Sequence, residues 1–390
     1  MRARARCHGG NRRLRRAMLA AATLTSAAAL AAIAAGRHFC RKLLDPEIAP
    51  PEYEAKVLEV APESDAAPRT VALERTEETL RQGVFGLEAD SGGHAILGRI
   101  VSATDEVVTR VVTEVRGELR RGTRVHVNTI VWNGDPEQSL GMPFEEVRFE
   151  TELGPMAAWH RPGRGDTWAV MVHGYKASRR GGFRDYPLLD DLGLPTLSVT
   201  YRNDPGNPGS PDGLIQLGAR EWLDVEGALR WARDRGAARF VIFGDSMGGA
   251  VTCALYHRSE LADRIDGLVL DAPVLDWRPV LALQARDRNL PGIVAASAGW
   301  WIRARIGLDF AAFDQIARAG AFEIPILLFH GTDDAVVPIE TSERFAAARG
   351  DLVTFFPADG AGHVQAWNVG PRIYEHRVRD FLTGVLGLGG

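Results

Sequence analysis

Cysteine is scarce in this sequence, and its scarcity excludes two kinds of cross-linked fold. Only three of the 390 residues are cysteine (Cys7, Cys40 and Cys253), and their spacing fits neither a disulfide framework nor a metal-binding cluster. A chain of this length buries enough apolar surface to fold without such cross-links. We therefore predict a globular protein that uses neither a metal nor another cofactor.

Acidic residues are missing from the first 42 positions, although the rest of the chain is acidic. Residues 1–42 contain ten arginines or lysines and no aspartate or glutamate. Residues 43–390 carry 36 basic and 50 acidic residues, a net charge of −14. Because proteins bind phosphate backbones through basic surfaces, this composition argues against nucleic acid as a partner.

Within this basic N-terminus, 20 uncharged residues run from Ala17 to Gly36. As a helix they would span about 30 Å, the thickness of the hydrocarbon layer of a membrane. Positive residues on both sides, with seven arginines before the stretch, predict a single-pass anchor in the cell membrane with an extracytoplasmic body. A cleaved signal peptide is the alternative, since Ala32-Ile33-Ala34 resembles a cleavage site, and the body would then be secreted.

The remaining chain divides into three segments of different character. Residues 43–70 are rich in proline and glutamate and are interpreted as a linker. Residues 71–149 are interpreted as a β-rich accessory region, with strands expected at 94–104, 107–115 and 123–131. From residue 150 to 388, strands alternate with helices, which predicts an α/β fold with a mostly parallel sheet between two layers of helices. Residues 276–321 interrupt this alternation and are expected to form a helical cap.

The strongest chemical signal is Gly244-Asp245-Ser246-Met247-Gly248, placed between an expected strand and a helix of small residues. A tight strand-to-helix turn of this kind exposes a nucleophilic serine, here Ser246. The N–H of Met247 would then face the oxyanion of an attacked carbonyl. A second donor is expected from the loop after the strand at 167–172, where the N–H of Tyr175 is the candidate.

A nucleophilic serine needs a base and an acid that orients this base. His363 lies in a glycine-rich loop between the last expected strand and the last helix, at the sheet edge where catalytic groups gather. Two candidate acids, Asp333 and Asp334, follow the expected strand at 326–329.

These segments resemble the α/β-hydrolase superfamily, in the branch of serine hydrolases with an H-G-x-x-D-x-x-V-P acid loop and a G-x-G-H histidine loop. The resemblance covers about residues 150–388 and implies that the acid is Asp334. The order Ser246, Asp334, His363 is also the order of this fold. Asp245 departs from the aromatic residue or histidine found there in many relatives, and we expect it to cap the following helix.

The resemblance implies hydrolysis of acyl esters, of a small molecule or a lipid, through a Ser-His-Asp triad and an acyl-enzyme. A peptidase of the same fold is the second interpretation, and a catalytically inactive scaffold at the cell envelope is a third, of another class. Trp300 and Trp301 in the expected cap are predicted to contact an apolar substrate. Arg202, which follows a strand near the expected mouth of the site, is predicted either to touch substrate or to hold the loop at 205–213 by a salt bridge.

Overall fold

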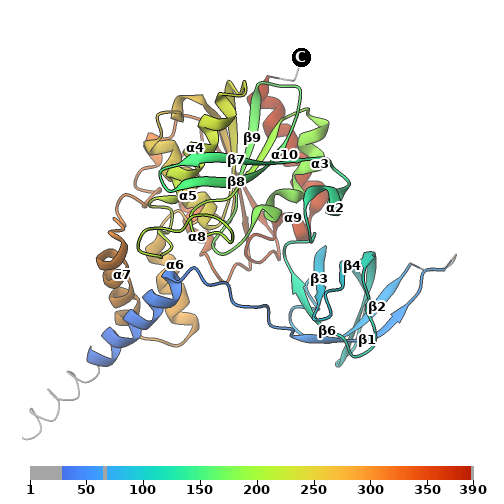
Figure 1. Ribbon diagram of the computed structural model, residues 1–390. Helices are drawn as coiled ribbons and strands as arrows, with labels where there is room; N and C mark the ends of the chain where they lie inside the picture. Colours follow the sequence, from blue (N-terminus) through green and yellow to red (C-terminus); the bar gives the residue numbers. More distant parts are fainter. Residues whose placement is uncertain (1–28, 65–67, 388–390) are drawn as a thin grey trace, which may run out of the picture.

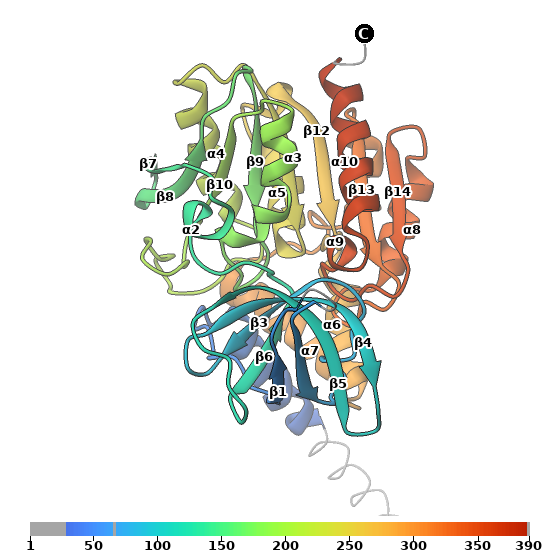
Figure 2. The same ribbon diagram turned by 90° about the vertical axis from the view of Figure 1, so that its right-hand side faces the viewer.

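The computed structural model describes residues 29–64 and 68–387, which form a small β-barrel, a larger α/β unit and an N-terminal helix (Figures 1 and 2). The predicted membrane segment, Ala17–Gly36, lies mostly outside the described residues. Its last eight residues begin a helix over residues 29–44, called here the N-terminal helix. Within the described part of the chain, no helix is both long and apolar enough to span a bilayer.

The barrel is formed by six short strands that close in the order β1-β2-β5-β4-β3-β6, with antiparallel pairing throughout. Apolar side chains such as Val57, Leu73 and Leu97 fill its interior. The strands are β1 (Ala55–Ala61), β2 (Thr70–Glu74), β3 (Phe85–Ala89), β4 (His94–Ala103), β5 (Val107–Arg116) and β6 (Arg124–Asn128).

The boundaries predicted for the N-terminal segments differ from those of the structure. The segment interpreted as a linker, 43–70, contains strand β1 and the first residue of β2. Its prolines lie outside β1, whose inward-facing positions Ala55 and Val57 are fully buried. The predicted accessory region, 71–149, ends within β7, which belongs to the larger sheet.

A fully buried arginine, Arg110, fastens one end of the barrel. Its guanidinium donates hydrogen bonds of 2.7–3.3 Å to four backbone carbonyls, those of Thr79, Arg81, Gly83 and Gly98. Burial lowers the pKa of Arg110 to about 10, so the side chain remains charged at neutral pH. The carbonyls take the place of water around this charge, and the loop between β2 and β3 is thereby held to strand β4.

The larger unit is built on an eight-stranded sheet in the order β14-β13-β12-β11-β9-β10-β8-β7, in which β8 runs antiparallel to both of its neighbours and all other neighbouring strands pair in parallel. Its strands are β7 (Glu145–Thr151), β8 (Gly154–Arg161), β9 (Thr167–Val172), β10 (Thr196–Val199), β11 (Arg239–Asp245), β12 (Ile265–Asp271), β13 (Ile326–Gly331) and β14 (Val353–Ala358). The predicted mostly parallel sheet is therefore confirmed.

Helices cover both faces of this sheet because its central strands are apolar on both sides. Along β9 and β11, alternate residues enter two separate cores. Helices α4 (Glu221–Arg233), α5 (Met247–Arg258) and α8 (Ile339–Ala348) pack on one face. Helices α3 (Tyr186–Asp191) and α10 (Pro371–Leu386) pack on the other (Figure 2). The chain also contains two short helices, α2 (Pro136–Leu140) and α9 (Ala366–Val369), and three 3-10 turns at Arg179–Arg184, Ala262–Arg264 and Ala319–Ala321.

The segment predicted as a cap contains helices α6 (Trp277–Asp287) and α7 (Gly292–Ile306). The N-terminal helix lies beside them (Figure 1). Its residues Cys40 and Leu44 are buried in the same core as α4 and α5. The C-terminal half of this helix is thus part of the α/β unit.

Replacing Arg110 by methionine should destabilise the protein by about 3 kcal/mol, because four buried or partly buried carbonyls lose the donor they share. Urea unfolding followed by circular dichroism measures the change. Arg120→Met is the matched control, because Arg120 lies in the same barrel unit with an exposed side chain. Equal midpoints for the two variants would contradict this role of Arg110.

Candidate active site

Ser246 lies in a sharp turn between the end of β11 and the start of α5. Its φ of 53° and ψ of −116° belong to a region that residues other than glycine rarely adopt. Two backbone hydrogen bonds of 3.0 Å hold the turn, from the Ser246 N–H to the Asp271 carbonyl and from the Val274 N–H to the Ser246 carbonyl. A Cβ atom at Gly248 would lie 2.2 Å from the carbonyl oxygen of Val172, so only glycine fits there.

The structure brings Ser246, His363 and Asp334 into one hydrogen-bonded row. Nε2 of His363 lies 2.7 Å from Oγ of Ser246, and Nδ1 lies 2.8 Å from Oδ2 of Asp334. The three residues come from the end of β11, the loop after β14 and the loop after β13. Asp333, the other candidate acid, is exposed and lies beside Thr332.

The environment of Asp334 determines which nitrogen of His363 carries a proton. Burial would raise the pKa of Asp334, but hydrogen bonds from His330 and His363 hold that pKa well below its ordinary value. Its other oxygen accepts the N–H groups of Val336 and Val337. Since the ionised carboxylate can only accept, Nδ1 of His363 donates to it, and Nε2 is left to accept the Ser246 hydroxyl proton.

The loop carrying Tyr175 packs directly against this turn. A Cβ atom at Gly174 would lie 3.1 Å from Cβ of Ser246. His173 helps to fix this loop, because its Nε2 lies 2.9 Å from Oδ2 of Asp204 and its ring stacks on Tyr201. Met247 is the first residue of α5, where a helix leaves its N–H groups without intrahelical partners.

Two cavities meet at Ser246 and Tyr175. The larger, of about 380 Å³, has a mostly apolar lining from the cap and the N-terminal helix that includes Leu43, Val274, Leu281, Val294 and Ile302. The smaller, of about 230 Å³, lies between the His363 loop and the segment that follows the barrel, and polar side chains such as Arg180 and Asn368 contribute to it. Ser246 thus lies where two mostly apolar cavities join, and the smaller one has more polar and charged residues among those that line it.

Two of these lining segments were missed by the sequence reasoning. Phe39, Cys40 and Leu43 of the N-terminal helix line the larger cavity, and the Leu43 carbonyl accepts a 2.9 Å hydrogen bond from the Tyr175 hydroxyl. On the other side, the buried Asn368 amide donates to the carbonyls of Val84 and Thr129 and ties α9, which follows the His363 loop, to the barrel unit. The aromatic residue Phe39, which follows the alanine-rich stretch and lies among basic residues, is the one signal that could have suggested the first contact.

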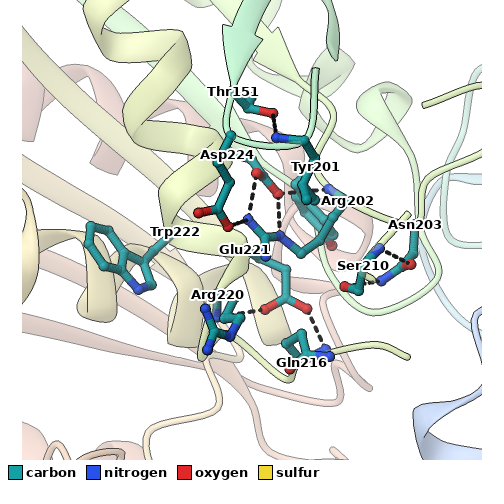
Figure 3. A network of polar contacts seen from close by, with 12 residues as sticks. Thr151, Tyr201, Arg202, Asn203, Ser210, Gln216, Arg220, Glu221, Trp222 and Asp224 are labelled. Carbon is teal, nitrogen blue, oxygen red and sulfur yellow. Dashed lines mark hydrogen bonds and ion pairs between the residues drawn. The ribbon is translucent and has the colours of Figure 1, made fainter. Parts of the chain in front are cut away.

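The predicted substrate contacts of Arg202, Trp300 and Trp301 do not match where these side chains lie. The Arg202 guanidinium is fully buried and forms an ion pair with Asp224 of α4 at 2.8 Å and another with Glu152 at 3.0 Å (Figure 3). It is therefore a salt-bridge residue, although its partners lie outside the loop at 205–213. Neither tryptophan lines the larger cavity: Trp300 is exposed to solvent, and Trp301 packs beneath Arg37.

Asp245 also differs from its predicted role, because it pairs with Arg184 at 2.6 Å and does not cap α5. The same guanidinium lies 3.1 Å from Asp271 and 3.5 Å from Asp185. One cation therefore faces three carboxyl groups, two of them fully buried, beside the turn at Ser246. Burial raises the pKa of Asp185 to about 7 and that of Asp245 to about 6, against the lowering effect of the Arg184 charge.

Comparison with known proteins identifies relatives for both units. The prolyl oligopeptidase family profile matches residues 213–388, and a profile described as a domain of unknown function (DUF8805) matches residues 56–128. An uncharacterized protein of Mycobacterium tuberculosis is 29% identical over 65% of this chain and 85% of its own length. Esterase LipC of the same organism is 26% identical over 75% of this chain and 74% of its own.

A solved structure similar to this chain is that of a Pyrococcus furiosus esterase, with a TM-score of 0.52 and 21% identity. The superposition covers 65% of this chain and 95% of the esterase. At this level of identity the similarity establishes the fold of the α/β unit.

The carboxyl cluster predicts how stability changes with pH. Because the pKa of Asp185 is raised in the folded state, the native protein binds more protons than the unfolded chain between about pH 4 and pH 7, and stability falls as pH rises through that window. Asp185→Asn removes this titrating group. From pH 5 to pH 8 its stability should therefore rise relative to wild type by about 2 kcal/mol.

Thermal unfolding at several pH values measures this difference. Asp191→Asn is the matched control, an aspartate on the same short helix whose side chain is exposed. Parallel pH profiles for wild type and Asp185→Asn would show that the buried carboxyl does not resist ionisation.

Proposed function

Because this chain belongs to the α/β-hydrolase superfamily, we propose that it is a serine hydrolase that cleaves acyl esters through a covalent acyl-enzyme. One observation carries the proposal: Ser246, His363 and Asp334 form an unbroken hydrogen-bonded row at the junction of two cavities. Their distances of 2.7 and 2.8 Å need no rearrangement before reaction.

In the proposed reaction, His363 Nε2 takes the Ser246 hydroxyl proton as Oγ attacks the ester carbonyl carbon. The resulting tetrahedral intermediate collapses when the bond to the alcohol oxygen breaks and His363 donates its proton to that oxygen. His363 then deprotonates a water molecule, which attacks the acyl-enzyme and releases the acid, and Ser246 regains its proton. Asp334 stays ionised throughout and orients the imidazole, as its low pKa allows.

The N–H groups of Met247 and Tyr175 are proposed to bind the oxyanion. The first belongs to the N-terminus of α5, where the helix dipole also favours negative charge. The second lies on the loop that packs against Ser246. The brace from Leu43 to the Tyr175 hydroxyl fixes this loop and makes the N-terminal helix a support of the site.

The two cavities suggest where the acyl and the alcohol portions of the substrate bind. An apolar cavity of about 380 Å³ is within the size of small-molecule sites and suits the hydrocarbon chain of the acyl group. The smaller cavity suits the alcohol portion, which leaves first. The similarity to esterase LipC of M. tuberculosis supports an ester substrate, and the apolar lining favours an acyl chain over a peptide.

Steady-state kinetics on p-nitrophenyl esters from acetate to palmitate test the proposal. We expect hydrolysis by the wild type with a preference for a medium or long acyl chain. Ser246→Ala and His363→Ala should each lower kcat by about 10⁴-fold or more, and the double variant should fall little further, because the two residues act as a unit.

The variant Ala295→Phe tests the role of the larger cavity independently of the catalytic groups, because Ala295 lines this cavity and not the smaller one. It should lower kcat/KM for the octanoate about tenfold relative to the acetate. A folded wild type that hydrolyses none of these esters would overturn the proposed activity. A variant with an unchanged chain-length profile would instead overturn the assignment of the cavity to the acyl chain.

A further inference from the structure

Large apolar side chains are exposed on two neighbouring helices beside the larger cavity. Among the described residues, eight large apolar side chains are exposed, and four of them lie on the N-terminal helix and α7. They are Leu30 (67% exposed), Ile33 (47%), Ile293 (56%) and Trp300 (60%), called here the apolar face. The two helices touch, because Oγ of Ser297 lies 3.5 Å from the Ile33 carbonyl oxygen and a Cβ atom at Gly36 would collide with Ser297.

The charges on these helices are all of one sign. Residues 29–44 and 292–306 contain no aspartate or glutamate. They carry five exposed cations: Arg37, Arg41, Lys42, Arg303 and Arg305. This contrasts with the net charge of −14 over residues 43–390. Exposed apolar residues bordered by cations, with a tryptophan among them, are typical of surfaces that bind anionic membranes.

The opposite sides of the same helices form a wall of the larger cavity. Phe39 and Leu43 of the N-terminal helix face it, as do Val294, Ala298 and Ile302 of α7. Leu30, Ile33, Ile293 and Trp300 are absent from its lining. Each helix therefore has one side toward the acyl cavity and the other toward solvent, so a membrane on the apolar face would lie next to the cavity.

We propose that the apolar face docks on an anionic lipid bilayer and that the substrates are acyl esters held in that bilayer. This inference rests on the proposed function and adds the source of the substrate. An acyl chain that passes from the bilayer into the cavity exchanges one apolar environment for another and is little exposed to water. The sequence from Ala17 to Ala28, which lies outside the described residues, is likewise uncharged.

The first test uses the full-length chain with Ile293→Cys, which carries an environment-sensitive nitrobenzoxadiazole label at position 293. Cys7→Ser removes the cysteine outside the described residues, and the two remaining cysteines are buried. Ile373→Cys provides the matched site, because Ile373 is 55% exposed but lies on α10. With vesicles of phosphatidylcholine and phosphatidylglycerol, fluorescence should rise about twofold or more at position 293 and stay unchanged at position 373.

Other outcomes of this test contradict the proposal. An equal response at both positions, or none at position 293, would show that the apolar face does not enter the bilayer. A signal at position 293 that grows with protein concentration without vesicles would assign the face to contact between copies of the chain. Because the label reports on α7 itself, attachment of the protein through residues 1–28 alone does not produce the expected result.

The second test compares soluble and vesicle-borne substrates. Ile293→Ser combined with Trp300→Ser should leave kcat/KM for soluble p-nitrophenyl butyrate unchanged, since neither residue lines a cavity. It should lower hydrolysis of a long-chain ester in anionic vesicles about tenfold, while Ile373→Ser should not. An equal rate of vesicle hydrolysis for all three proteins would overturn the proposed docking. Failure of the wild type on the soluble ester would overturn the proposed function instead.

Discussion

The turn at Ser246 is the constraint on which the rest of the site depends. A serine with φ of 53° persists there only because its neighbours hold it: hydrogen bonds join its backbone to Asp271 and Val274, and α5 lies so close to β9 that position 248 admits only glycine. The turn places the Ser246 hydroxyl at the end of β11, directly before the first residue of α5. His363 and Asp334 then need only emerge from the neighbouring strand ends to complete the row.

Two segments from the N-terminal part of the chain, the N-terminal helix and the barrel, approach this row from two sides. The N-terminal helix supports the Tyr175 loop through the Leu43 carbonyl and lines the apolar cavity. The barrel unit supports α9, the helix that follows the His363 loop, because Asn368 donates to carbonyls of Val84 and Thr129. Both parts therefore touch segments next to the hydrogen-bonded row. A displacement of the N-terminal helix or of the barrel would therefore be transmitted to the site through one or two hydrogen bonds.

What could be predicted from the sequence was mainly what depends on local pattern. The turn at 244–248, the strand ends before Asp334 and His363, and the alternation of strands and helices are short-range features whose residues lie close together in the chain. Contacts between distant segments left no such pattern. The ion pairs of Arg184 with Asp245 and Asp271 join residues 61 and more positions apart, and the pairing of Arg202 with Asp224 depends on how α4 packs. Strand β1 was hidden because prolines on both sides of a short strand resemble a linker.

The central claim is that Ser246 is a nucleophile activated by His363, and covalent labelling tests it most directly. The full-length protein would be treated with an alkyl fluorophosphonate, digested, and its peptides weighed by mass spectrometry, beside His363→Ala. The account predicts one phosphonylated peptide, containing Ser246, and labelling at least about 100-fold slower in the variant. A folded wild type that remains unlabelled at Ser246, or that is labelled at the same rate without His363, would contradict the account.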